Sequence, residues 1–389
     1  MRGHVSYDVV NRLSMGNLYS AVVNSVKKGN SSSIQQYLVG EGIMGKGKNI
    51  LFFNYGRNAL YALFKERFTG GEIIFPGFIC PSTAWAAVKA GIRPRFVDVS
   101  LQDFNLDISL LSEEEIETAD ALFLNHTFGV PADLDRIHAR IKGHHIYIIE
   151  DTAQALFARY KGEYLGTLGD AVLLSMYKQT PNLHGAILLS DLKISETRKG
   201  NQSLDDLARL LWLTTGPHDS LLKIIRKRKG LPGESDELHR EKALCQPSPL
   251  SLSLFDALLP SLKDLVGQKQ TIARHYQRRS KESKYLIPQY FSQDKEPSWF
   301  NFSVRLLPEI AQVRDALLIS LRRKGIFCDR LWHDSPVAIN IFKEYLKGDC
   351  PNAKYLARSV INMPIKANYQ EGDVDYLFDI IEETIRGLI

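Results

Sequence analysis

The sequence predicts an α/β protein with a mostly parallel seven-stranded sheet flanked by helices, followed by a smaller C-terminal α+β domain. Two observations carry this prediction. From residue 50 to residue 190, short apolar runs of the kind that form buried strands alternate with helical patterns, which is typical of βαβ units. After a long helical pattern, the order then changes to a strand, a helix, a short strand and a closing helix.

Composition sets the broad class. The chain has 389 residues, of which 44% are hydrophobic and 24% charged, which suits one or two domains with a sizeable core. A net charge of +5 permits anionic substrates such as nucleotides but does not indicate nucleic-acid binding. Cys80, Cys245, Cys328 and Cys350 show no metal or redox spacing, which favours a reducing cytoplasm and no metal site.

The N-terminus lacks the apolar core of a signal peptide. No apolar run approaches the about 18 residues that a membrane span requires. We therefore expect a cytoplasmic enzyme with no membrane span.

Residues 1–48 form an N-terminal segment, expected to pack on the large domain or on a partner subunit because no strand precedes Asn49. Within it, 9–26 has some helical periodicity, whereas 29–33 and 40–47 have the composition of loops.

The large domain is expected over 49–250. Its seven strands are expected at 50–53, 72–75, 95–99, 121–124, 146–149, 171–174 and 186–189, with helices at 58–68, 81–90 and 132–142.

Residues 196–250 are polar and are expected to be irregular. They contain the basic run KIIRKRK at 223–229, which is either a solvated helix end or a contact for phosphate, nucleotide or an anionic surface.

A connecting helix is expected over 251–282, and the small domain over 283–389. Its expected elements are a strand at 300–306, a helix at 309–324, a short strand at 360–363 and a helix at 373–388.

One acid and one amine follow two of the predicted strands. Asp151 follows the strand at 146–149, and Lys178 follows the strand at 171–174. Because ligands of open α/β sheets bind beyond the carboxyl ends of the strands, both side chains are expected to face one crevice. An amine held near a carboxylate suits a Schiff-base cofactor. The neighbouring Glu150 is expected to be structural, because adjacent strand residues point to opposite faces.

Three motifs in this region resemble the cofactor site of the DegT–StrS family of sugar aminotransferases, which are pyridoxal-phosphate (PLP) enzymes of fold type I. They are EDTAQA at 150–155, G-x-x-G-D at 166–170, and S-x-x-K at 175–178 with a proline-containing loop after it. The resemblance covers the chain in outline from about residue 50 onward and is specific from about 50 to about 190.

The resemblance implies a role for each of four residues. Lys178 would hold PLP as an internal aldimine and then act as the base that moves the substrate proton. Asp151 would pair with the protonated pyridine nitrogen and keep the ring an electron sink. Gln154 would contact the ring near its phenolic oxygen, and Ser175 would contact the phosphate.

A second phosphate contact is expected where a strand leads into a helix, because helix N-termini offer backbone donors to anions. The sequence Asn54-Tyr55-Gly56-Arg57-Asn58-Ala59-Leu60 is similar to the family turn S-G-T-x-A-L. Gly56 and the amides of Arg57 and Asn58 would then cradle the phosphate, with Arg57 adding a positive charge. An ordinary βα turn is the alternative.

The chain departs from the family pattern in two places. Cys80 stands where an aromatic residue usually stacks on the cofactor ring, so that Phe78, another ring or the sulfur itself would take that place. The loop 178–186, KQTPNLHGA, keeps only Gly185 of the usual glycines. His184 there is expected to be solvated rather than to contact substrate. His126 fits the pattern V-H-x-x-G-x-P and either lines the pocket or is a hydrogen-bonded structural histidine.

The resemblance implies an aminotransferase that moves an amino group from an amino acid, expected to be glutamate, to a nucleotide-linked keto-sugar by a ping-pong cycle through Lys178. Its products would serve polysaccharide or other amino-sugar biosynthesis. The expected partners are small-molecule substrates and a second copy of the chain in a homodimer. A non-sugar ketone, and a degenerate member acting as a binding or regulatory protein, remain alternatives. A dehydratase is disfavoured by Lys178, because the family's dehydratases carry histidine there.

Overall fold

The computed structural model describes residues 31–43, 48–193, 198–215, 244–346 and 348–389, together with 13–14, 16 and 18–19. The basic run at 223–229 and most of the helical pattern at 9–26 lie outside the described residues.

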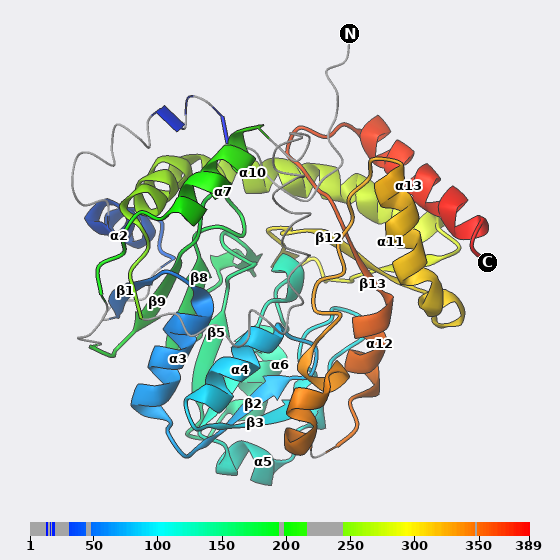
Figure 1. The fold of residues 1–389 in the computed structure, drawn as a ribbon. Coiled ribbons are helices and arrows are strands. Elements are labelled where there is room, and N and C mark those ends of the chain that lie inside the picture. Colours follow the sequence, from blue (N-terminus) through cyan, green and yellow to red (C-terminus); the bar gives the residue numbers. More distant parts are fainter. Residues whose placement is uncertain are drawn as a thin grey trace.

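A seven-stranded sheet forms the centre of the molecule, in the order β1-β9-β8-β5-β4-β2-β3 (Figure 1). Its strands are β1 Asn49–Phe53, β2 Glu72–Pro76, β3 Arg93–Val97, β4 Ala121–Asn125, β5 Tyr147–Asp151, β8 Ala171–Ser175 and β9 Ala186–Ser190. The five strands from β8 to β3 are parallel, and β9 runs antiparallel to both of its neighbours. The predicted fold class is confirmed.

Strands β8 and β9 form a hairpin. Ser175 pairs with Ala186, and this pair encloses the loop 176–185, which contains Lys178. The loop therefore leaves the sheet at the carboxyl end of β8, beside the carboxyl ends of β4 and β5.

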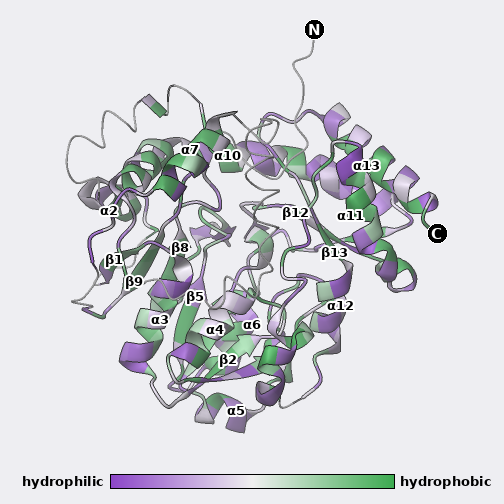
Figure 2. Cartoon of the chain, viewed as in Figure 1, coloured by the Kyte–Doolittle hydropathy of each residue, from purple (hydrophilic) through white to green (hydrophobic). Residues whose placement is uncertain are grey.

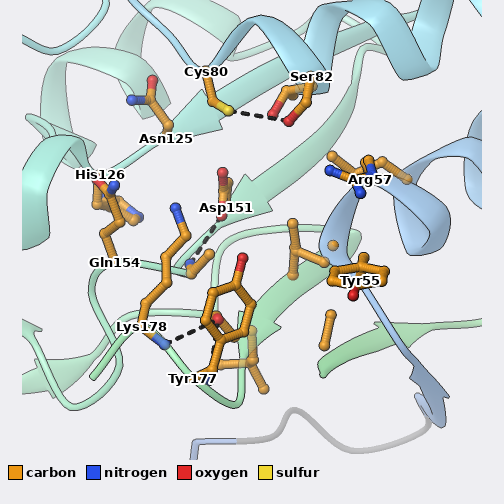
Figure 3. A pocket seen from close by; sticks show the side chains of 18 of the residues that line it. Tyr55, Arg57, Cys80, Ser82, Asn125, His126, Asp151, Gln154, Tyr177 and Lys178 are labelled. Atoms are coloured by element: carbon orange, nitrogen blue, oxygen red, sulfur yellow. Dashed lines mark hydrogen bonds between the residues drawn. The ribbon is translucent and has the colours of Figure 1, made fainter. Parts of the chain in front are cut away.

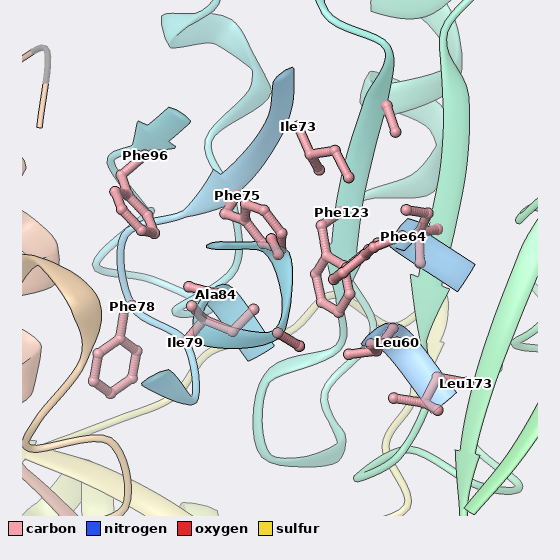
Figure 4. Packing of buried hydrophobic residues seen from close by; sticks show 14 of the residues in the cluster. Leu60, Phe64, Ile73, Phe75, Phe78, Ile79, Ala84, Phe96, Phe123 and Leu173 are labelled. Carbon is pink, nitrogen blue, oxygen red and sulfur yellow. The ribbon is translucent and has the colours of Figure 1, made fainter. Parts of the chain in front are cut away.

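Helices cover both faces of the sheet, because successive strand residues point to opposite sides. On one face, Phe75 of β2 stacks on Phe123 of β4 with ring centroids 5.1 Å apart (Figure 4). Phe64 of α3 packs edge-on against Phe75, at 6.1 Å. The helices on this face are α3 Gly56–Arg67 and α4 Pro81–Lys89.

On the other face, Leu122 and Ile148 pack with Ile116 of α5 and Ile137 of α6. These helices span Glu113–Thr118 and Leu134–Ile141. Figure 2 shows the hydrophobic strands enclosed by helices whose outer faces are more polar. In the part of the chain that the structure describes, no helix is both long and apolar enough to cross a membrane.

A smaller antiparallel sheet, β10-β12-β13, lies in the C-terminal half. Its strands and the helices around it are β10 Leu286–Pro288, β12 Phe302–Leu306, β13 Val360–Met363, α11 Arg314–Arg323, α12 Pro351–Ser359 and α13 Glu371–Arg386. The 34-residue helix α10, Pro249–Glu282, runs along both sheets (Figure 1) and contributes to the hydrophobic core of each. A third small sheet joins β11 Lys295–Glu296 to β6 Arg159–Tyr160 and β7 Glu163–Tyr164.

Two predictions about irregular regions are wrong. The helix α7, Leu204–Thr215, lies within the stretch expected to be irregular. Its start is fixed by reciprocal hydrogen bonds, since Asp206 N–H donates to Ser203 Oγ and Ser203 N–H donates to the Asp206 carboxylate. The helix α2, Ser31–Gly40, begins inside the expected loop at 29–33, because Ile34 and Leu38 pack into the core beside α10.

Candidate active site

A pocket lies at the carboxyl ends of β4, β5 and β8 and at the N-terminus of α3 (Figure 3). It brings together most of the site residues expected from the sequence, namely Gly56, Arg57, Cys80, Asp151, Gln154, Ser175 and Lys178. Asn58 does not line it. The Asn58 side chain donates to Asn54 Oδ1 at 2.8 Å, and its backbone N–H donates to Tyr55 O at 3.1 Å. Asn58 therefore braces the turn that precedes α3.

Asp151 and Lys178 face the same pocket. In Figure 3 the Lys178 side chain extends from its loop so that the amine end points toward Asp151. The Lys178 backbone N–H donates to Ser175 Oγ at 3.3 Å, and the amine lies 5.7 Å from the centroid of the Phe300 ring. Burial raises the pKa of Asp151, and a hydrogen bond from Ala153 N–H and the positive charge of Lys178 oppose that shift.

Glu150, which precedes Asp151, points to the opposite side and is structural in this fold. Its buried carboxylate accepts hydrogen bonds from His126 Nε2 at 3.0 Å and from the backbone N–H groups of Gly166, Leu168 and Gly169 at 2.7, 3.1 and 2.8 Å. Burial alone would raise its pKa, but these donors outweigh burial and lower the pKa of Glu150. The motifs at 150–155 and 166–170 are therefore two halves of one hydrogen-bonded unit.

His126 combines the two roles left open by the sequence. It lines the pocket, and it is fully hydrogen-bonded. Its Nδ1 accepts from Ala132 N–H at 3.0 Å, so the ring proton resides on Nε2, which donates to Glu150.

Gln154 presents a donor at the pocket wall. Its Oε1 accepts from Phe128 N–H at 3.0 Å, and this bond fixes which end of the amide is the oxygen. The remaining Nε2 is buried and has no hydrogen-bond partner in the described structure. A buried donor of this kind is costly unless a ligand supplies the acceptor.

Of the alternatives considered for the aromatic position at Cys80, the structure places other rings and Cys80 itself at the pocket, but not Phe78. Phe78 does not line the pocket. It is buried and packs edge-on against Phe128 and Trp332, at 5.9 and 5.4 Å. The rings that do line it are those of Tyr55, Tyr177 and Trp332, and Cys80 lines it beside them with Sγ 3.1 Å from Ser82 Oγ.

Several lining residues were not predicted from the sequence, among them Asn125, Tyr177 and Trp332. Asn125 carried a signal, because it is a polar residue at a strand end where the family pattern has valine. Its Nδ2 donates to Thr127 Oγ1 at 2.8 Å, and its buried Oδ1 has no partner among the described residues. Trp332 carried no local signal, since it reaches the pocket from a loop after α11.

His184 is not solvated, contrary to expectation. Its Nε2 lies 2.9 Å from Asp206 Oδ1 on α7 and 3.3 Å from Ser248 Oγ at the start of α10. Burial lowers the pKa of His184. Both contacts use the same ring nitrogen, so this serine, histidine and aspartate are not arranged as a catalytic triad. His184 instead ties the Lys178 loop to two helices.

Comparison with known proteins identifies the family. A sequence profile described as the DegT/DnrJ/EryC1/StrS aminotransferase family matches residues 53–186 and 251–382. The spore coat polysaccharide biosynthesis protein SpsC of Bacillus subtilis is 23% identical over 325 residues, covering 82% of this chain and 80% of that protein. The dTDP-3-amino-3,4,6-trideoxy-alpha-D-glucose transaminase of Streptomyces venezuelae is 26% identical, covering 81% and 76%.

Among solved structures, the Escherichia coli GDP-4-keto-6-deoxy-D-mannose-3-dehydratase with bound hydrated PLP superposes with a TM-score of 0.74. The sequence identity is 18%, and the match covers 97% of this chain and 100% of that chain. This likeness extends the shared fold to nearly the whole protein. The chain belongs to the DegT/DnrJ/EryC1/StrS aminotransferase family of PLP-dependent enzymes.

Proposed function

We propose that the protein transfers an amino group from an amino acid, with glutamate as the first candidate donor, to a nucleotide-linked keto-sugar in a ping-pong reaction. One observation carries the proposal. The amine of Lys178, the carboxylate of Asp151 and the unpaired Nε2 donor of Gln154 meet in a single pocket at the strand ends. The transaminase from Streptomyces venezuelae, whose name denotes a dTDP-linked amino sugar, supports the substrate class.

The pocket residues fit PLP. When bound, PLP supplies an electron sink that weakens bonds at the substrate carbon. Asp151 would accept a hydrogen bond from the ring nitrogen, and Gln154 Nε2 would donate to the ring oxygen. Gly56 and Arg57, at the N-terminus of α3, and Ser175 would hold the phosphate. The unpaired donor on Gln154 is the structural feature that most directly calls for such a ligand.

The chain's own groups then divide the work. Lys178 Nζ would hold the cofactor covalently, release it to the donor, and take the proton from the donor's Cα. Asp151 would keep the ring nitrogen protonated. Because burial disfavours the ionised form of Asp151, a cationic N–H opposite it is the partner that would stabilise its charge. The rings of Trp332, Tyr55 and Tyr177, which line the pocket, would shield these steps from water.

The oligomer and the compartment belong to the same proposal. We expect a homodimer in which the partner completes the pocket, as the family resemblance implies. The cysteines Cys80, Cys245, Cys328 and Cys350 are all unpaired, which fits a reducing compartment such as the cytoplasm.

The test is the absorption spectrum of the purified protein with PLP, recorded beside Lys178→Ala and followed by addition of glutamate. We expect the wild type to show the visible band of lysine-linked PLP and glutamate to convert it to the pyridoxamine form. The Lys178→Ala protein should show neither. A folded wild type with no such band at excess PLP would refute the enzyme and leave a binding or regulatory protein. A band that glutamate leaves unchanged would refute this donor.

A further inference from the structure

Behind the wall of the pocket lies a buried lysine to which the proposed reaction assigns no role. Lys269 of α10 is 4% exposed. Its amine donates to Trp299 O at 3.2 Å and to Gln179 Oε1 at 3.4 Å. Among the described residues no carboxylate lies within ion-pair distance of it, so a cation is buried against neutral acceptors.

The hydrogen bonds continue from Lys269 to the pocket. Gln179 Nε2 donates to Gln154 O and to Ser298 Oγ, both at 2.8 Å, and Ser298 Oγ donates to Gln154 O at 3.2 Å. Gln179 is 1% exposed and directly follows Lys178 in the chain. The series of contacts therefore reaches one side of the pocket at Gln154 and another side at Lys178.

Three segments meet at this point with no spare room. A Cβ placed on Gly129 would lie 2.8 Å from Gln154 O, 3.0 Å from Phe300 N and 3.0 Å from Ser298 Oγ. Ser298 N–H donates to Gly129 O and Phe300 N–H donates to Phe128 O, each at 3.1 Å. The ring of Phe300 in turn lies near the Lys178 amine. Small movements of this cluster would therefore be transmitted to the groups that face the pocket.

Burying a cation costs desolvation free energy, and an apolar residue of similar volume would pack at least as well. A charge-assisted hydrogen bond is stronger and more directional than a neutral one, and it polarises the amide that accepts it. The Lys269 ammonium thus holds Gln179 in one orientation, and Gln179 holds the main chain of Gln154.

We infer that Lys269 and Gln179 are positioning residues, which set the direction of the Gln154 amide and of the Lys178 amine in the pocket. The inference rests on the proposed function, because both groups that they orient are proposed contacts of PLP. Lys269 acts through Gln179 and does not itself reach the pocket.

The experiment compares PLP binding to the wild type, Lys269→Met, Gln179→Glu and the control Lys263→Met. Lys263 lies on the same helix but is exposed and contacts Glu41. Gln179→Glu keeps an acceptor for Lys269 and loses the donors to Gln154 and Ser298. The readouts are the dissociation constant of PLP and, at saturating PLP, the visible circular dichroism per bound cofactor, which reports its orientation.

Lys269→Met and Gln179→Glu should each weaken PLP binding about tenfold, which is the usual effect of one lost buried hydrogen bond. Both should also reduce the circular dichroism, and Lys263→Met should change neither readout. Thermal unfolding without PLP identifies a variant that fails to fold, and the other variant then decides. Dissociation constants within twofold of the control, in a wild type that binds PLP normally, would overturn this inference alone. A wild type without the lysine-linked band would instead overturn the proposed function.

Discussion

Two buried polar clusters flank the pocket, and they differ in how they accommodate a charged side chain in the protein interior. The Glu150 cluster consists of Glu150, His126, Gly166, Leu168 and Gly169, and its carboxylate has four donors. The Lys269 cluster consists of Lys269, Gln179, Gln154, Ser298 and Trp299, and its ammonium has only neutral acceptors. Glu150 is fully satisfied by the fold around it, whereas Lys269 retains uncompensated charge.

The difference appears in the pKa values. The four donors lower the pKa of Glu150 even though burial opposes them. Burial lowers the pKa of Lys269 to about 8, and the nearby charge of Lys366 adds to the effect. The comparison indicates that the Glu150 cluster stabilises the fold. The Lys269 cluster lowers the stability of the fold but holds side chains in place. Each of the following changes tests that contrast.

The largest effect is expected from Glu150→Gln. The amide would place its own N–H against backbone donors and leave at least one of them unpaired in the interior. Breaking a buried charged network in this way costs about 3–5 kcal/mol in the free energy of unfolding. Urea denaturation measures it, with the cofactor absent. A loss below about 1 kcal/mol would show that the turn at 166–169 does not depend on this carboxylate.

Lys269 should make the free energy of unfolding rise with pH in the alkaline range, because burial lowers its pKa in the folded protein. The folded pKa of Lys269 is about 8 and its ordinary value is 10.5, so between these values the unfolded chain binds more protons. The free energy of unfolding of the wild type, relative to Lys269→Met, should therefore increase by up to about 3 kcal/mol across this window. A flat difference from pH 8 to pH 10 would contradict the buried cation.

Glu150 gives the same direction of pH dependence in the acid range, although its charge stabilises the fold and that of Lys269 does not. Because the pKa of Glu150 is lowered in the fold, its contribution is present above its ordinary value of 4.5 and is lost as pH falls through the folded pKa. The stability difference between wild type and Glu150→Gln should shrink as the pH falls below this value. A difference that stays constant down to pH 3 would place the effect in packing and not in charge.

A tightly packed glycine lies in or beside each cluster, Gly169 within the Glu150 cluster and Gly129 against the Lys269 cluster, and the two can be compared. A Cβ on Gly169 would lie 2.6 Å from the Glu150 Cβ, and one on Gly129 would lie 2.8 Å from Gln154 O. Gly169→Ala should destabilise by about 1–3 kcal/mol through overpacking, and Gly129→Ala should add backbone strain to a similar loss because its φ is +93°. Only Gly129→Ala should also weaken PLP binding. The readout is the dissociation constant of PLP, measured by titration under conditions in which both variants are folded. Equal effects on binding would erase the distinction between the clusters.

The smallest effect is expected at Asn125, which belongs to neither cluster. Asn125→Val removes the hydrogen bond to Thr127 but also removes the buried Oδ1 that has no partner in the described structure. These contributions oppose one another, so the free energy of unfolding should change by less than about 1 kcal/mol. A larger loss in thermal or urea unfolding would show that Asn125 supports the end of β4.

Sequence reasoning located the parts of this protein that are encoded locally. The strand at 360–363 was predicted to the residue and the strand at 171–174 to within one residue, because short apolar runs between turns specify buried strands. Asp151 and Lys178 were expected at one pocket because they follow neighbouring strand ends, and Gln154 was expected there because the family resemblance implies it. Their roles toward PLP remain predictions.

The residues whose burial or place in the pocket was not predicted depend on contacts between distant segments. Lys269 looks like any helix lysine in the sequence, and its amine is buried where Gln179 and Trp299, from two other segments, meet α10. Trp332 enters the pocket from a loop far along the chain. His184 was expected in solvent because its partner Asp206 lies on α7, a helix that had been read as irregular chain. Burial of a polar residue is set by the tertiary fold, so no local pattern reveals it.

The β8–β9 hairpin has an evolutionary consequence. Its closing pair, Ser175 with Ala186, fixes the register of the two strands, and residues 179–183 of the loop that it encloses are buried, so a residue gained or lost there would disturb packed contacts. Lys178 lies on this packed loop, and Asp151 lies within a strand where a single insertion would reverse every side chain after it. Insertions and deletions are thus expected to be tolerated poorly at both the amine and the acid, so that lineages sharing this scaffold would diverge there by substitution and not by changes in length.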